Sequence, residues 1–201
     1  MIAIIDYDAG NIRSVQKACE ALGDEEVAVT GDGEEILAAD RVILPGVGAF
    51  GSAMERLKAR GLDEVIRRVA DSGRPFLGIC LGLQLLFEES EESPGVAGLG
   101  ILRGKILRIP DKTVRVPHIG WNSLTFPNEG RLFAGIGEEP FVYFVHSYYL
   151  KAADEAVVRA RTSYGVEIDA SVESKNVFAT QFHPEKSGKT GLLILKNFLA
   201  L

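Results

Sequence analysis

The sequence has few of the residues that build disulfides and metal sites, with two cysteines and three histidines in 201 residues. Cys19 and Cys80 stand in very different local sequences, so no disulfide is expected. His118, His146 and His183 are too widely separated to form a closely spaced ligand pair, and no metal site is predicted.

Long apolar runs and excess positive charge are also missing. No apolar run approaches the roughly 20 residues of a membrane helix, and residues 1–6 lack the charged start and apolar core of a signal peptide, so we expect a cytoplasmic protein without a membrane partner. Lys and Arg number 22 against 28 Asp and Glu, a net charge of -6 that disfavours nucleic acid as a partner. We expect one domain over residues 1–201, since no repeat or linker interrupts the chain.

The first half alternates short apolar strands with helical patterns. Strands are predicted at residues 2–5, 27–30, 42–44 and 76–79, and helices at 11–22, 32–38, 52–59 and 62–70. Continuously apolar strands separated by helices predict a parallel sheet with helices on both faces.

The pattern of predicted elements changes in the second half of the chain. Residues 101–171 alternate strands with turn signals at 127–130 and 163–165, which predicts mostly antiparallel structure. A last strand at 177–181 precedes a helix from Ser187, whose apolar stripe is predicted to contain Leu192, Leu195, Phe198 and Leu199. The fold class is therefore α/β, with a mostly parallel central sheet and an antiparallel extension.

An apolar strand runs directly into a helical pattern at residues 75–86, and Cys80 stands at the junction. Gly78 and Gly82 give the Gly-x-Cys-x-Gly spacing of a nucleophile elbow, a turn too tight for other side chains at those positions. The elbow holds the thiol at a helix N-terminus, which favours the thiolate. The alternative is a buried core cysteine whose glycines serve close packing.

Two neighbours of this thiol are expected to meet a substrate. The N–H of Leu81, the residue after the nucleophile, is predicted to donate to an oxyanion. Gln84, four residues after Cys80, lies on the same helical face.

Partners for the thiol follow at residues 181–187. Residues two apart in an extended segment point to the same side, so Glu185 can hold one nitrogen of His183 while the other faces the thiol. The alternative is a helix start in which Ser187 is the N-cap and Glu185 and Lys186 are solvated loop charges. Given the elbow, we interpret Cys80 as nucleophile, His183 as base and Glu185 as its orienting acid.

Two glycine-rich segments resemble nucleotide-binding motifs without meeting their requirements. Residues 46–51 match the dinucleotide pattern but follow the third strand, and no acidic residue stands about twenty positions on. Residues 188–190 resemble the end of a phosphate loop, but His183 occupies the place of its first glycine. No nucleotide cofactor is expected. The loop at residues 46–51 would instead complete the oxyanion hole.

The elbow and the His-Pro-Glu motif resemble class I glutamine amidotransferases, which have a flavodoxin-like fold. Within that family the chain is similar, from end to end, to the glutaminase subunits of imidazole glycerol phosphate synthases. The segments that carry this similarity are Asp6–Tyr7, Gly10–Asn11, Leu44–Phe50, Val116–Asn122 and Tyr143–Tyr148. The pair Asp8–Ala9 departs from the family, which usually has glycine and a small or apolar residue there.

The resemblance implies a glutaminase that needs no cofactor. Its oxyanion hole would use Val47 and Leu81, and its glutamine contacts would come from Gly46, Gly48, Gln84, His146, Ser147 and Tyr148. Ammonia would pass to a barrel-shaped cyclase subunit in a heterodimer, which forms imidazole glycerol phosphate and an aminoimidazole carboxamide ribotide. Without this partner, whose face would meet Trp121, Asn122, Tyr143 and Lys186, activity would be feeble.

Other interpretations stay open from the residues. Trp121 can fill the core, Tyr143 can be an ordinary strand residue and Lys186 a solvated charge. The chain can serve another synthase, such as the pyridoxal phosphate or anthranilate system. A cysteine peptidase, a thiol chaperone and a catalytically silent binding subunit are the remaining alternatives.

Overall fold

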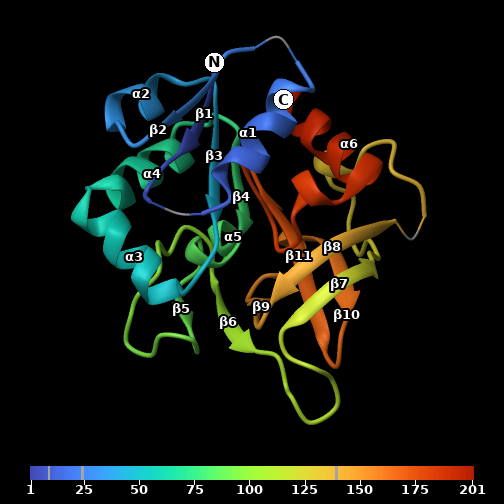
Figure 1. Cartoon of the computed structure of the whole chain (residues 1–201). Helices are drawn as coiled ribbons and strands as arrows, with labels where there is room; N and C mark the ends of the chain where they lie inside the picture. The colour runs from blue at the N-terminus through green and yellow to red at the C-terminus, as the bar shows by residue number, and fades with distance from the viewer. Residues whose placement is uncertain (9, 24, 139) are drawn as a thin grey trace.

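The structure is a computed structural model that describes residues 1–8, 10–23, 25–138 and 140–201. Its centre is a seven-stranded sheet in the order β10-β11-β12-β4-β3-β1-β2 (Figure 1). The parallel strands are β1 (Ile2–Ile5), β2 (Val27–Thr30), β3 (Arg41–Gly46), β4 (Phe76–Cys80) and β12 (Val177–Thr180). Their order is that of the flavodoxin-like fold, so the predicted sheet is confirmed. The unusual pair Asp8–Ala9 includes a residue outside the described ranges.

The antiparallel extension is also confirmed. Strands β10 (Val158–Ser163) and β11 (Glu167–Ser174) continue the sheet beyond β12. Two small sheets complete this half: β5 (Glu89–Ser90), β6 (Gly104–Arg108) and β9 (Tyr148–Ala152) form one, and β7 (His118–Ser123) and β8 (Phe141–His146) form the other. Short 3-10 turns lie at η1 (Arg131–Phe133), η2 (Glu155–Val157) and η3 (Pro184–Lys186).

Helices cover both faces of the central sheet. Figure 1 shows α2 (Gly33–Ala38), α3 (Phe50–Ala59) and α4 (Leu62–Asp71) together, with α1 (Ile12–Glu20) beside α6 (Gly188–Leu199). Alternate residues of β1 enter opposite cores: Ile2 and Ile4 belong to the cluster of α1 and α6, and Ala3 and Ile5 to the cluster of α2 to α4. No helix in the described ranges is long and apolar enough to cross a membrane.

The predicted stripe of the C-terminal helix needs one correction. Leu192 is 37% exposed, and Leu199 is only partly buried. The buried residues of α6 are Gly191, Ile194, Leu195 and Phe198. These positions follow the i, i+3, i+4, i+7 pattern of one helix face, and Leu192 lies one position, about 100°, away from it.

Candidate active site

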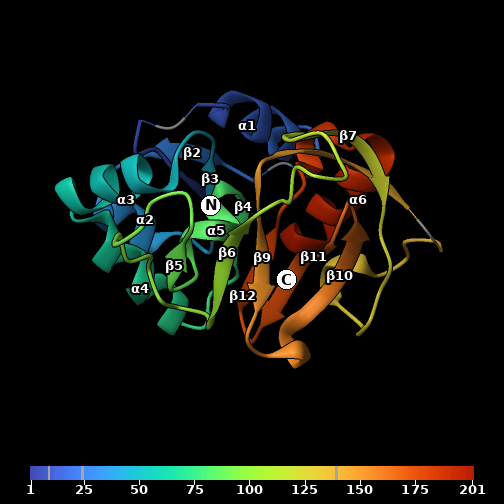
Figure 2. The same cartoon turned by 90° about the horizontal axis from the view of Figure 1, so that it is seen from below.

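The site lies at the carboxyl ends of three neighbouring parallel strands. Gly46 at the end of β3 pairs with Cys80 at the end of β4, and Thr180 at the end of β12 pairs with Ile79. Figure 2 views the molecule from this end, where β4 runs into the five-residue helix α5 (Leu81–Leu85). Because parallel strands place their carboxyl ends at one edge, the segments that follow them meet there.

Cys80 occupies the strained turn that the glycine spacing predicts. Its φ of 55° and ψ of -107° are rare for a residue with a side chain. A Cβ on Gly78 would lie 2.8 Å from the carbonyl oxygen of Gly82, and one on Gly82 would collide with the carbonyl oxygen of Leu44. Both glycines are therefore required for the elbow, and the short α5 gives it only a brief helix dipole.

His183 and Glu185 form a buried pair. The Nδ1 atom of His183 lies 2.8 Å from Oε1 of Glu185, and the two side chains are 1% and 0% exposed. Glu185 is therefore not a solvated loop charge, although Lys186 is exposed. Ser187 stands at the N-cap position of α6, but its hydroxyl donates to the carbonyl of His183 at 2.6 Å instead of capping the helix.

The surroundings of His183 favour its protonated form. Burial lowers the pKa of His183, but Cys80 and Glu185 outweigh burial and raise the pKa to about 9. Its Nε2 atom is buried without a hydrogen-bond partner among the described residues. Protonated at both nitrogens, the ring can donate from Nε2 as well as from Nδ1.

Two amide side chains that the sequence did not predict also contact the group formed by Cys80, His183 and Glu185. The Nδ2 atom of Asn11 donates to Oε1 of Glu185 at 2.7 Å, the same oxygen that binds His183. The fully buried Gln181 places Nε2 3.7 Å from the sulfur of Cys80. Gln181 stands two residues before His183, so the two-residue periodicity of an extended segment indicates it. Glu185 itself does not lie in the extended segment that the sequence predicted but in the 3-10 turn η3, which brings its carboxylate to Nδ1 of His183.

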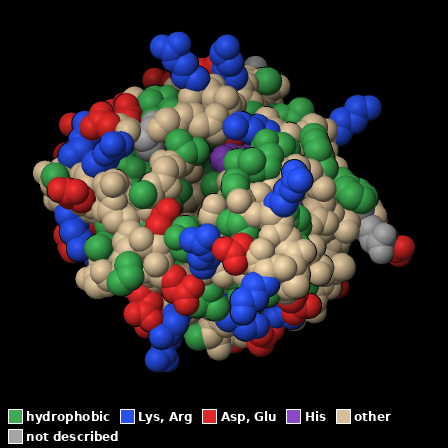
Figure 3. Space-filling model, turned by 60° about the horizontal axis from the view of Figure 1, so that its bottom comes forward, with side chains coloured by type: hydrophobic (Ala, Val, Ile, Leu, Met, Phe, Trp, Pro, Cys, Tyr) green, Lys and Arg blue, Asp and Glu red, His purple; other side chains and the backbone are tan. Residues whose placement is uncertain are grey.

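A cavity of about 330 Å³ opens beside the cysteine sulfur. Its lining includes eight predicted site residues: Val47, Gly48, Cys80, Leu81, Gln84, His146, Ser147 and Tyr148. Gly46 does not line it, but lies against Leu81. Figure 3 turns the lower end of Figure 1 forward and shows a histidine surface next to hydrophobic side chains. The structure thus brings most of the predicted site together.

Glu92, Pro117 and Val145 also line the cavity. Glu92 Oε2 accepts the N–H of Phe50 at 2.8 Å and so caps the start of α3 from a distant segment. In the sequence this glutamate belongs to an acidic run, residues 88–92, that is typical of a solvated surface. Only the long-range contact shows that its carboxylate borders the cavity.

His118 and His146 form one neutral unit in the cavity wall. The carbonyl of Tyr148 lies 2.8 Å from Nδ1 of His146, so this nitrogen donates and Nε2 accepts from Nδ1 of His118 at 3.0 Å. Burial lowers the pKa of His118 to about 4 and that of His146 to about 3. The ring of His118 stacks on Tyr164, with centroids 3.9 Å apart. Both rings are occupied in holding the wall.

Of the four residues predicted to meet a partner, three lie on the β7–β8 sheet and Lys186 lies in η3. Trp121 is 55% exposed and therefore does not fill the core. It stands opposite the half-buried Tyr143 in the β7–β8 register, with ring centroids 6.1 Å apart. Asn122 instead donates to the carbonyl of Ser163 at 3.0 Å. Ile119 and Phe141, 61% and 57% exposed, extend this apolar surface.

Metal binding finds no support in the arrangement of donors. Among residues 1–8, 10–23, 25–138 and 140–201, no three His, Cys, Asp or Glu side chains are grouped to hold an ion.

Residues 3–201 match the family model described as glutamine amidotransferase class-I. The chain is 51% identical to the imidazole glycerol phosphate synthase subunit HisH of Methanocaldococcus jannaschii, over 100% of both chains. It is 55% identical to the HisH subunit of Moorella thermoacetica, over 98% of this chain and 93% of the other.

Solved structures show the same fold at lower identity. A structure described as a glutamine amidotransferase has a TM-score of 0.78 and 22% identity, and the match covers 100% of this chain and 98% of that one. The PurLQS structure from Thermotoga maritima matches with a TM-score of 0.74 at 22% identity, over 99% and 97% of the two chains.

Proposed function

We propose here how the residues of this chain act. The chain belongs to the class I glutamine amidotransferases and, within them, to the HisH glutaminase subunits of imidazole glycerol phosphate synthase. The chain hydrolyses glutamine in histidine biosynthesis. The observation that carries the residue assignments is the strained Cys80 next to the buried His183–Glu185 pair.

Cys80, His183 and Glu185 act as a catalytic triad. The Cys80 thiolate attacks the side-chain amide carbon of glutamine, and His183 gives its Nε2 proton to the departing ammonia. A glutamyl thioester is left on the sulfur. The now neutral His183 takes a proton from water, whose oxygen attacks the thioester and frees glutamate. Glu185 accepts a hydrogen bond from Nδ1–H of His183 throughout, which keeps Nε2 directed at the reacting atoms.

The developing oxyanion is held by backbone N–H groups of Leu81 and Val47. Leu81 is the first residue of α5, whose first N–H groups have no acceptor within the helix. Val47 borders the same cavity from the β3–α3 connection. Two donors from separate segments match the usual composition of an oxyanion hole after a nucleophile elbow.

Glutamine is recognised by the remaining cavity wall. Glu92 is the acidic residue of the cavity lining, so its carboxylate pairs with the α-ammonium group of the substrate. Gln84 and the backbone of Gly46, Gly48 and His146 to Tyr148 supply the other contacts. The Gln84 amide is already oriented, because its Nε2 donates to the carbonyl of Tyr148 at 3.0 Å.

The apolar surface on β7–β8 receives the partner subunit. Exposed large apolar side chains gathered on one face are typical of a protein interface, and Ile119, Trp121 and Phe141 supply them beside Tyr143. Lys186 joins this interface from η3, and Asn122 reaches it from the opposite face of β7. The partner is the barrel-shaped cyclase subunit, which forms a heterodimer with this chain and receives its ammonia. The single domain spans residues 1–201, and its free thiols suit a cytoplasmic location.

The test is glutamate release by the chain alone, with the cyclase subunit, and with that subunit plus its nucleotide ligand. Release that rises with the partner and again with its ligand is expected. A pyridoxal phosphate or anthranilate synthase subunit serves as the control partner. Substantial turnover by the isolated chain, unchanged by any synthase, would contradict the coupling, and near wild-type release by a Cys80→Ser complex would contradict the nucleophile.

A further inference from the structure

Tyr7 carries a buried hydroxyl that the mechanism above does not use. The residue stands two positions after the end of β1, its side chain is 1% exposed, and its hydroxyl has no hydrogen-bond partner among the described residues. An unpaired buried O–H group costs free energy, so natural proteins rarely keep one without a reason. The ring belongs to the same core cluster as Phe50 and Leu81, on the α3 side of the sheet.

This hydroxyl lies against Gly46, at the carboxyl end of β3. A Cβ atom on Gly46 would collide with Oη of Tyr7, and it would lie 3.0 Å from Cβ of Leu81 and 3.2 Å from the backbone nitrogen of Gly82. Tyr7 and the elbow therefore flank the same glycine. Burial, and then the charge of Cys80, raise the pKa of Tyr7 well above its usual value, so the hydroxyl keeps its proton and acts as a donor.

The peptide between Gly46 and Val47 connects this hydroxyl with the oxyanion hole. The only cis peptide among the described residues is Val116–Pro117, so the Gly46–Val47 peptide is trans and its N–H and C=O point in opposite directions. Tyr7 does not line the substrate cavity, whereas Val47 does. When the N–H of Val47 points into the cavity, the carbonyl of Gly46 consequently points back toward the interior, where the hydroxyl lies.

We propose that the Tyr7 hydroxyl donates a hydrogen bond to the Gly46 carbonyl when the Val47 N–H faces the cavity, and is thus a positioning residue for the oxyanion hole. This inference rests on the proposed glutaminase function. In the arrangement described here the hydroxyl is unpaired, so pairing favours the peptide orientation that serves catalysis. Turning this peptide changes ψ of Gly46, which has no Cβ to restrict it.

The test compares Tyr7→Phe with Tyr149→Phe in the complex with the cyclase subunit and its ligand. Tyr149 is also buried but lies on β9 in a different core cluster, which makes it a matched control. Tyr7→Phe is expected to lower kcat for glutamate release about tenfold, since a misplaced oxyanion donor weakens transition-state stabilisation. The KM for glutamine should change less than about twofold and the melting temperature should not fall, because the lost hydroxyl was unpaired.

An unchanged kcat in Tyr7→Phe, with an active wild type, would overturn this inference alone, and a wild type without glutaminase activity would overturn it together with the proposed function. A fall in kcat accompanied by a lower melting temperature and a higher KM would show a packing role instead. A second measurement is independent of activity. Gly46→Ala should destabilise the wild type more than it destabilises Tyr7→Phe, because the added methyl group collides with the hydroxyl, and equal effects in both backgrounds would also overturn the inference.

Discussion

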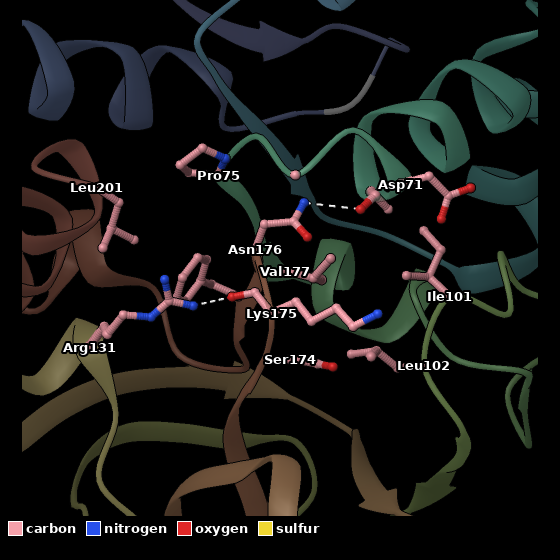
Figure 4. A pocket seen from close by; sticks show the side chains of 13 residues that line it. Asp71, Pro75, Ile101, Leu102, Arg131, Ser174, Lys175, Asn176, Val177 and Leu201 are labelled. Atoms are coloured by element: carbon pink, nitrogen blue, oxygen red, sulfur yellow. Dashed lines mark hydrogen bonds between the residues drawn. The ribbon is translucent and has the colours of Figure 1, made fainter.

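Two cavities lie at opposite ends of the strands β4 and β12. The one at the carboxyl ends measures about 330 Å³ and is lined by Cys80. The one at the amino ends measures about 800 Å³, and its lining includes Pro75 and Val177, which stand at the starts of these strands (Figure 4). The larger cavity is thus not the one that the candidate nucleophile lines.

The difference lies in how well the polar groups are paired. At the amino ends, Asn176 donates to the carbonyls of Ala70 and Arg74 at 3.0 and 2.8 Å, and Arg131 pairs with Glu173. None of the residues lining that cavity has a buried side-chain polar atom without a partner, within the ranges that the structure describes. The described residues that line the smaller cavity have none either, but three such atoms belong to residues behind it: Tyr7 Oη, His183 Nε2 and Glu185 Oε2. The unpaired imidazole and carboxylate atoms behind the smaller cavity therefore distinguish this end better than volume does.

The largest effect is expected for the nucleophile. Cys80→Ala should lower glutamate release by the complex at least about 1,000-fold, because no thioester can form. Cys19→Ala, which removes a buried thiol on α1, is the control and should leave kcat within about twofold. Stimulated release by Cys80→Ala at more than about a tenth of the wild-type rate would erase the distinction between the two cavities.

The second largest effect is expected for Glu185, whose charge orients His183. Glu185→Gln should lower kcat about 100-fold or more, since the carboxylate that holds the Nδ1 proton is gone. The Glu185 charge raises the pKa of His183 and burial lowers it, so in the variant that pKa falls. The alkaline limb of the pH–rate profile should consequently move to lower pH, and an unshifted limb would argue against the pair.

Substrate recognition at the smaller cavity predicts a different kinetic pattern. Glu92→Gln should raise the KM for glutamine about 10-fold, the value of a charge-assisted hydrogen bond, with kcat changed less than about threefold. Glu91→Gln is the matched control, because Glu91 accepts from the backbone of Arg108 outside the cavity. Equal KM values for the two variants would remove Glu92 from the substrate site.

Acid should weaken the wall of the smaller cavity. His118 and His146 have pKa values of about 4 and about 3 in the fold, below the usual 6.5, so the unfolded chain binds protons that the fold does not. Their contribution to the unfolding free energy is present above pH 6.5 and is lost as the pH falls toward 4, at up to about 1.4 kcal/mol per pH unit for each group. His118→Gln should flatten this slope in urea unfolding, and an identical slope would contradict the assignment. His183 has the opposite pH dependence. Because its pKa is raised in the fold, its contribution to the unfolding free energy is lost as the pH rises through about 9.

The smallest effect is expected at the larger cavity. Asn176→Ala removes the amide that joins the end of α4 to β12 and should lower the unfolding free energy by about 1 kcal/mol. Glutamate release by the complex should stay unchanged, because these bonds serve the fold. A change in kcat at constant stability would show that the larger cavity communicates with the site.

Sequence patterns predicted much of the fold and the geometry around Cys80 for physical reasons. The parallel strands could be predicted because they are apolar on both faces, and the elbow because only glycine fits beside Cys80. The exposed Leu192 escaped prediction, since several registers of an apolar helix satisfy the same periodicity. Glu92 and Asn11 escaped because their partners lie far away in the chain, 42 positions for Phe50 and 174 for Glu185.

The amino-acid sequence by itself determined which turn Cys80 occupies, which residues alternate along each strand, and that Glu185 stands close enough in the chain to reach His183. All of these follow from local backbone geometry over two to four residues. Only the tertiary structure decided that β12 lies beside β4, which brings His183 to the sulfur. It also decided that the carboxylate of Glu92 borders the cavity and that Trp121 stays at the surface, because strand order and loop packing depend on the whole chain folding together.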